Sequence, residues 1–246
     1  MSIEYLVGLK DLKLNDVDRV GFAWNPYKSV FHHGLNFLKS PVDFTSYVFE
    51  KSSHNGGVSR LSKFKKMLSA EKNLNKHFNS NINLKFLDHH LCHAASSFYC
   101  SGFEDSFVFV SDGAGEIASI SIFYFSRDSF RLLYRNNFPD SIGLLYATVT
   151  QLLGFIPLID EYKVMGLTPY GQPKYADKIL DHIMDLKDDG SFRLDLDYFD
   201  YCTGLRMTND RFHELTFADV NKDSFLDIFG YAQREGRGVL WINTFE

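Results

Sequence analysis

The stretch SFVFVSDGAGEIASISIFYFSRDSFRLLYRNNF, Ser106–Phe138, decides the fold that the sequence predicts. It contains three runs rich in β-branched and aromatic residues, which is typical of strands. The turn DGAGE separates the first run from the second, and the polar turn RDS separates the second from the third. Because strands joined by such short turns pair antiparallel, the stretch predicts a three-stranded antiparallel meander.

Helical patterns flank this meander on both sides. Apolar residues at helical spacing predict helices at 57–78, 89–101, 142–155 and 175–186, and the start of one at 224–238. Short strands are predicted at 20–24 and 84–86, and a strand or hairpin at 190–201. The sequence therefore predicts a mixed α/β chain, with an antiparallel meander, flanking helices and no clear domain boundary.

Composition and charge narrow the classes of function. The chain has 246 residues, 45% of them hydrophobic, and a net charge of -5 gives no overall attraction to nucleic acid or anionic lipid. No apolar run approaches the roughly 20 residues that span a bilayer. Glu4 stands where a signal peptide would carry positive charge, and three cysteines make no even disulfide framework. We expect a cytoplasmic protein with no membrane segment and no nucleic-acid partner.

The segment DHHLCHAASSFY, Asp88–Tyr99, has three histidines within five residues. His89 and His93 are four residues apart, so they lie on one face of a helix. Two imidazoles one turn apart can bind one divalent ion, whereas His90 lies about 100° around the helix. The pair alone leaves two interpretations open: a metal site, or histidines that serve packing or the surface. Cys92, between them, is interpreted as a packing residue.

Asp112 stands where an apolar strand ends, immediately before a glycine turn. A carboxylate there emerges at the mouth of a sheet, where ligand sites tend to form. Gly113 and Gly115 permit positive φ or a close approach to a ligand, and the amide N–H groups of such a turn can face a phosphate. The alternative is a tight hairpin turn, which Asp-Gly often makes. Two histidines, a carboxylate and open positions form a recurring ligand set for catalytic iron or zinc.

Two longer stretches carry a family resemblance. DHHLCHAASSFYCSGFEDSFVFVSDGAGE at 88–116 and SIGLLYATVTQLLGFIPLIDEYKVMGLTPYGQP at 141–173 resemble the O-carbamoyltransferases of the nodulation and antibiotic-tailoring type. The resemblance continues more weakly from LNDVDRVGF to about residue 210. It implies an actin-like ATPase (ribonuclease H-like) fold, similar to that of the tRNA threonylcarbamoyl-transferase. It also implies that His89, His93 and Asp112 bind a divalent metal, iron in this family, with zinc as the alternative.

The resemblance implies a reaction as well. ATP and carbamoyl phosphate form carbamoyl-adenylate in a separate domain, and the actin-like domain passes the carbamoyl group to a hydroxyl of a sugar or antibiotic-like small molecule. The backbone at Gly113 and Gly115 would approach the nucleotide phosphate. Glu116 would either orient the acceptor hydroxyl or cap the turn. Lys163 would either contact a phosphate or the acceptor, or be an exposed helix lysine.

The chain departs from the family pattern at three places. It lacks a first hairpin with a His-Asp-x-Ser turn, a Gly-Gly-x-x-x-Asn element with a further metal-binding Asp, and the adenylate-forming domain. We therefore expect a truncated, incomplete actin-like domain: 1–85 a remnant of the first subdomain, 86–215 the motif-bearing region, 216–246 a divergent tail. A separate chain carrying the adenylate-forming domain is the expected partner, and transfer by this chain alone is expected to be absent or very weak. Two alternatives stay open: a non-catalytic remnant that binds metal or nucleotide, and a metallohydrolase.

Overall fold

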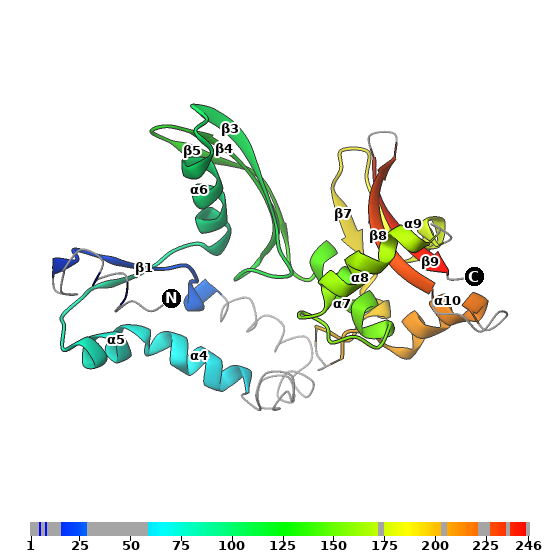
Figure 1. Ribbon diagram of the computed structural model, residues 1–246, viewed down its shortest axis with the longest axis horizontal. Coiled ribbons are helices and arrows are strands. Elements are labelled where there is room, and N and C mark those ends of the chain that lie inside the picture. The colour runs from blue at the N-terminus through cyan, green and yellow to red at the C-terminus, as the bar shows by residue number, and fades with distance from the viewer. Residues whose placement is uncertain are drawn as a thin grey trace. The chain divides into compact units, whose positions relative to one another are not determined.

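The computed structural model describes residues 5, 8, 16–28, 59–171, 175–202, 206–220, 227–234 and 237–244 (Figure 1). Contacts within the chain divide it into two compact units. The first comprises residues 1–108, 115–117 and 125–129, and the second comprises 109–114, 118–124 and 130–246. In the part of the chain that is described, no helix has the length and apolar character needed to cross a membrane.

The first unit begins with a short parallel pair of strands. β1 (Val20–Phe22) pairs with β2 (Leu84–Phe86), with Val20 opposite Leu84. The side chain of Asn75 holds the chain before β2, because its Nδ2 donates to the Ile82 carbonyl at 2.9 Å and its Oδ1 accepts from the Ile82 amide at 2.7 Å. Both predicted strands are confirmed.

The predicted helix at 57–78 is wrong as a single element. The structure has two helices, α4 (Arg60–Leu68) and α5 (Ala70–Phe78), with Ser69 between them at φ -91° and ψ 5°. The amide of Ser69 still donates to the Lys65 carbonyl, and the carbonyl of Ser69 already accepts from Asn73. The apolar spacing does not reveal this break, because one non-helical residue rotates the following helix only slightly. The break falls at a serine, a residue that readily leaves helical geometry.

Helix α6 (His89–Ser101) has a defined start and end. The Asp88 carboxylate accepts from the Leu91 amide at 3.0 Å, and Gly102 ends the helix at φ 78°. These are the usual N-cap and C-cap arrangements. His90, Ala94 and Phe98 form the buried face of α6, and the Phe98 ring lies 5.1 Å from that of Phe125. The helix is therefore fixed by caps and by packing, which fixes the direction of its histidines.

The predicted meander is confirmed. β3 (Asp105–Ser111), β4 (Ala118–Ser126) and β5 (Phe130–Asn137) form one sheet in the order β3–β4–β5 (Figure 1). β4 is central and almost wholly buried. In β3, Val108 and Val110 are buried and Phe107 and Phe109 are exposed, as the alternation of a strand requires.

The second unit adds helices and a small hairpin after the meander. Its elements are α7 (Ile142–Leu152), α8 (Glu161–Leu167), η3 (Thr168–Tyr170), α9 (Ala176–His182), β6 (Met184–Leu186), β7 (Phe192–Leu194), η4 (Leu196–Tyr198) and α10 (Asp210–Val220). β6 and β7 pair antiparallel. The core of this unit includes Leu145, Val149, Ile179, Ile183, Phe192 and Phe212.

Three predictions in this half need correction. The helix expected at 175–186 ends at His182, because Met184–Leu186 pairs as β6 with Phe192–Leu194. The helix expected to begin in 224–238 is a strand, β8 (Asp227–Arg234), paired antiparallel with β9 (Arg237–Thr244). The run VLWIN in β9 supplies β-branched and aromatic residues that favour a hairpin. Helix α10 was not predicted.

Candidate metal centre

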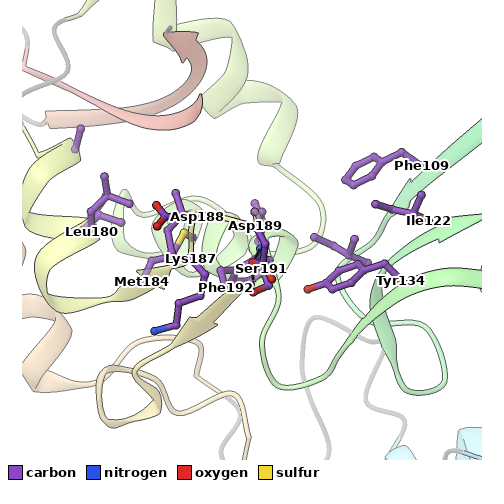
Figure 2. Close-up of a pocket in the computed structure, with 16 residues that line it drawn as sticks. Phe109, Ile122, Tyr134, Leu180, Met184, Lys187, Asp188, Asp189, Ser191 and Phe192 are labelled. Carbon is purple, nitrogen blue, oxygen red and sulfur yellow. Dashed lines mark hydrogen bonds between the residues drawn. The ribbon is translucent and has the colours of Figure 1, made fainter. Parts of the chain in front are cut away.

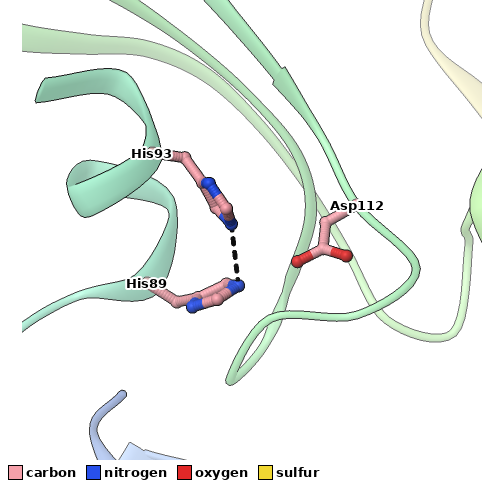
Figure 3. Close-up of side chains that lie close together, drawn as sticks. All are labelled: His89, His93 and Asp112. Carbon is pink, nitrogen blue, oxygen red and sulfur yellow. Dashed lines mark hydrogen bonds between the residues drawn. The ribbon is translucent and has the colours of Figure 1, made fainter. Parts of the chain in front are cut away.

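Two histidine rings converge at the start of α6. His89 Nε2 and His93 Nε2 lie 3.1 Å apart, and the ring centroids lie 4.5 Å apart. Figure 3 shows the two rings one helical turn apart, with the Asp112 carboxylate facing them. One ligand atom from each of the three residues lies within 4.8 Å of the others. Among the described residues, no other three His, Cys, Asp or Glu side chains meet in this way.

The orientation of the His89 ring is set by backbone. Its Nδ1 lies 2.9 Å from the Ala23 carbonyl oxygen, which can only accept, so Nδ1 carries the proton. The Trp24 ring packs against the imidazole with centroids 4.9 Å apart. Histidines that bind metals usually donate their second ring N–H to a carbonyl or carboxylate in this manner. Nε2 of His89 therefore presents its lone pair toward His93.

The spacing of the two nitrogens fits a shared ion. Ligand nitrogens 2.0–2.1 Å from a metal lie roughly 3.0 Å apart at a right angle and roughly 3.4 Å apart at a tetrahedral angle. The observed 3.1 Å falls in this interval. His89 and Asp112 are half-buried and His93 is exposed, so solvent or a substrate can reach the group. Three protein ligands with an accessible side are what catalytic rather than structural sites provide.

The Asp112–Gly113 turn is held by the start of α7. The Ser141 hydroxyl lies 2.6 Å from the Gly113 carbonyl oxygen and 3.2 Å from that of Asp112, and Ser141 Oγ also accepts from the Leu144 amide at 3.1 Å. Ser141 is fully buried. A Cβ on Gly143 would lie 2.8 Å from Gly113 Cα, so α7 meets this turn backbone to backbone. Neither Gly113 nor Gly115 has positive φ; what the turn requires is this close approach.

The Glu116 side chain is buried, and its carboxylate already accepts hydrogen bonds. Its Oε1 accepts from the backbone amide of His89 at 3.2 Å and from that of Asn25, which makes the shorter contact. The carboxylate thus joins the segment after β1 to the first residue of α6. These contacts support the structural alternative for Glu116, although the partners are segments distant in sequence rather than its own turn.

Lys163 makes a local ion pair at the start of α8. Its Nζ lies 2.9 Å from Asp160 Oδ1, while Asp160 Oδ2 accepts from the Ile156 amide at 3.1 Å. The hydrogen bond from Lys163 lowers the pKa of Asp160, and the same bond raises the pKa of Lys163. Lys163 is therefore a cation that cannot serve readily as a base, while a role as a point charge stays a prediction.

Cys92 is partly buried on α6 between the histidines. Burial raises the pKa of its thiol, and the Asp88 and Glu116 carboxylates raise it further. A thiol in such surroundings stays protonated near neutrality and is a poor metal ligand. This agrees with the interpretation of Cys92 as a packing residue.

Three groups that shape this centre were not predicted from the sequence: the Ala23 carbonyl, the Asn25 amide and the Ser141 hydroxyl. The first two are backbone atoms, which no residue type reveals. Ser141 had a usable signal, because a serine directly before a helical apolar run is a common N-cap.

Comparison with known proteins shows the family to which the chain belongs. The family model described as Carbamoyltransferase N-terminus matches residues 2–224, and the chain belongs to this family. An uncharacterized protein of Synechocystis sp. is 48% identical over 132 residues, which cover 54% of this chain and 22% of that protein.

Two named relatives come from nodulating bacteria. The nodulation protein NolNO of Sinorhizobium fredii is 38% identical over 140 residues, covering 57% of this chain and 20% of that protein. The nodulation protein NolO of Bradyrhizobium diazoefficiens is 40% identical over 113 residues, covering 45% of this chain and 20% of that protein. The chain thus matches about a fifth of the length of each of these curated relatives.

Substitution of Gly143 tests the packing behind Asp112. We expect Gly143→Ala to lower the free energy of unfolding by about 1–3 kcal/mol, because the new methyl group meets backbone that has no room to yield. Gly166→Ala is the matched control, since it lies within α8 with no atom within 4 Å of the added Cβ. The control should raise stability by about 0.5–1 kcal/mol. Urea unfolding of both variants measures the difference. If Gly143→Ala raised stability as much as Gly166→Ala, the close contact between α7 and the Asp112–Gly113 turn would be contradicted.

Substitution of Glu116 separates its structural role from a catalytic one. Glu116→Ala leaves two amides without an acceptor and should cost about 1–3 kcal/mol of unfolding free energy. Glu116→Gln keeps an oxygen acceptor and should recover most of this loss. Hydrogen exchange at the His89 and Asn25 amides should accelerate in the alanine variant and much less in the glutamine variant. Unchanged exchange in Glu116→Ala would show that the carboxylate does not hold these segments.

Proposed function

We propose that His89, His93 and Asp112 hold a divalent metal, iron with zinc as the alternative, in an enzyme that transfers a carbamoyl group from carbamoyl-adenylate to a hydroxyl of a small molecule. The observation that carries the proposal is the 3.1 Å approach of the two Nε2 atoms beside the Asp112 carboxylate. Membership of the carbamoyltransferase family supports the reaction. We include in the proposal that the meander and its helices belong to an actin-like domain, for which family membership is again the support.

The proposed reaction forms one bond to the carbamoyl carbon, breaks another and releases one proton. The acceptor oxygen bonds to the carbamoyl carbon, the bond from that carbon to the phosphate oxygen breaks, AMP leaves, and the hydroxyl proton passes to a base or to water. When bound, the metal would supply a Lewis acid for the carbamoyl carbonyl or a counter-charge for the phosphate. The hydrogen bond from His89 Nδ1 to the Ala23 carbonyl leaves the lone pair of His89 Nε2 available to hold the metal. The Gly113 amide donates to Asp112 Oδ1 at 2.6 Å, so the amides of Ala114 and Gly115 are proposed to approach the phosphate, with Lys163 as a further positive charge.

A metallohydrolase is less well supported. Hydrolysis at a metal site usually needs a general base within hydrogen-bond reach of the attacking water. Glu116 was the acid that could take this role, and its Oε1 already accepts from two backbone amides in a buried position. Among the described residues the acid nearest the ion would be Asp112, which is itself a proposed ligand.

The proposed reaction has two substrates, a hydroxyl acceptor and a carbamoyl donor. We propose a sugar or antibiotic-like hydroxyl compound as the acceptor. We propose that carbamoyl-adenylate is supplied by an adenylate-forming domain, with membership of the carbamoyltransferase family as the support.

Metal analysis tests the ligand set. The chain, loaded with Fe²⁺ under anaerobic conditions and desalted, should retain about one ion. His89→Ala and His93→Ala should each weaken binding by on the order of 100-fold, because each removes one of three ligands. His182→Ala, an exposed histidine at the end of α9, is the control and should bind as the parent chain does. Titration calorimetry with Co²⁺, which tolerates air, gives the same comparison. Metal content that is unchanged in His93→Ala would refute the site.

Nucleotide binding tests the reaction class separately. AMP should bind the metal-loaded chain about tenfold more tightly than the metal-free chain if the ion contacts the phosphate. Adenosine, which lacks the phosphate, is the control and should show no dependence on metal. Calorimetric titrations of both ligands, with and without Co²⁺, make the measurement. If the metal affected the binding of AMP and adenosine equally, the proposed metal site would be unaffected, but the proposed contact between the metal and the nucleotide phosphate would be refuted.

A further inference from the structure

The second unit contains a cavity of about 440 Å³ that the metal centre does not use (Figure 2). One wall comes from the sheet, with Phe109, Ile120 and Ile122. The opposite wall comes from α9 and the β6–β7 hairpin, with Leu180 and Met184. The volume is within the range of roughly 300–1,000 Å³ that small-molecule sites have. All the lining residues belong to the second unit, and no proposed metal ligand is among them.

The polar part of this cavity is acidic. Asp189 and Ser191, in the β6–β7 turn, face the Tyr134 side chain, whose hydroxyl points toward them in Figure 2. Asp189 Oδ1 accepts from the Ser191 amide at 2.9 Å and from the Ser191 hydroxyl at 2.6 Å. These bonds fix the carboxylate and lower the pKa of Asp189. Asp188 is the next residue along the same lining.

Among the described lining residues Lys187 is the one cation. It forms an ion pair outside the lining, and its charge also contributes to the lowered pKa of Asp189. Lys187 Nζ lies 2.6 Å from Asp185 Oδ2, and Asp185 is outside the lining. Tyr134 adds no charge, because burial raises the pKa of its hydroxyl and the Asp189 and Asp140 carboxylates raise it further. At neutral pH the cavity therefore combines apolar walls with a negative edge and a neutral hydroxyl.

We propose that this cavity binds a small hydrophobic amine, with its apolar body between the sheet and α9 and its ammonium group at Asp189 and the Tyr134 hydroxyl. An amine has donors for both groups and no acceptor that Asp189 would repel. An anion of the same shape would meet Asp188 and Asp189, and a neutral molecule would gain only the apolar contact. The site is independent of the carbamoyl-transfer proposal, because it requires neither metal nor nucleotide.

Matched probes test the proposal on the 246-residue chain. 2-Naphthylmethylamine, 2-naphthalenemethanol and 2-naphthoate share an aromatic body and differ in charge. Calorimetry or ligand-detected NMR should show the amine binding about fivefold more tightly than the alcohol, as expected for a partly exposed ion pair, and the carboxylate binding most weakly. Asp189→Asn should reduce the amine to the affinity of the alcohol and leave the alcohol unchanged.

Two further variants define the location. Asp181→Asn removes the same charge from an exposed position on α9 outside this lining and should preserve the preference for the amine. Ile122→Trp fills the cavity and should weaken all probes together, with circular dichroism to confirm folding. Equal affinities of the amine and the alcohol for the parent chain would overturn the proposal. So would a preference that survives Asp189→Asn, whether or not Ile122→Trp folds.

Discussion

One buried carboxylate joins the parts of the first unit that prepare the centre. Glu116 accepts from the amides of Asn25 and His89, so the segment after β1 and the start of α6 meet on a single oxygen. Burial of a carboxylate is costly unless donors compensate it, and two backbone amides do so here. The same segment after β1 carries the Ala23 carbonyl that orients His89. Loss of the Glu116 contact would therefore disturb the histidine through both its backbone and its ring.

The second unit restrains the Asp112 turn by different means. Ser141 binds two successive carbonyls of that turn, and Gly143 permits α7 to touch it directly. A ligand set must be held to within a fraction of an ångström to favour one ion over others. Neutral hydrogen bonds and close backbone packing suit this task, because they add no charge that would compete with the proposed metal for Asp112. The predicted ligands are thus supported by residues with no chemical role of their own.

The sequence was informative where the relevant physics is local. The spacing of His89 and His93 fixes their shared face once a helix forms, and Asp112 follows a strand that its own residues specify. The role of Glu116 was not predictable, because Asn25 lies 91 residues away and contributes a backbone amide. The break at Ser69 and the hairpin at Asp227–Thr244 were not predicted for another reason: apolar spacing is compatible with more than one backbone path. The pattern of Gly34–Phe49 favours neither helix nor strand, and this segment lies outside the described residues.

The hydrogen bonds of the two rings also indicate how the histidines are prepared. His89 Nδ1 carries the proton given to Ala23, so His89 Nε2 must accept in the 3.1 Å contact, and His93 Nε2 must donate. To bind an ion through Nε2, His93 has to move that proton to Nδ1, whereas His89 needs no change. The two rings are therefore unequal: the Nε2 lone pair of His89 already faces the other ring, whereas that of His93 becomes available only when its proton moves to Nδ1.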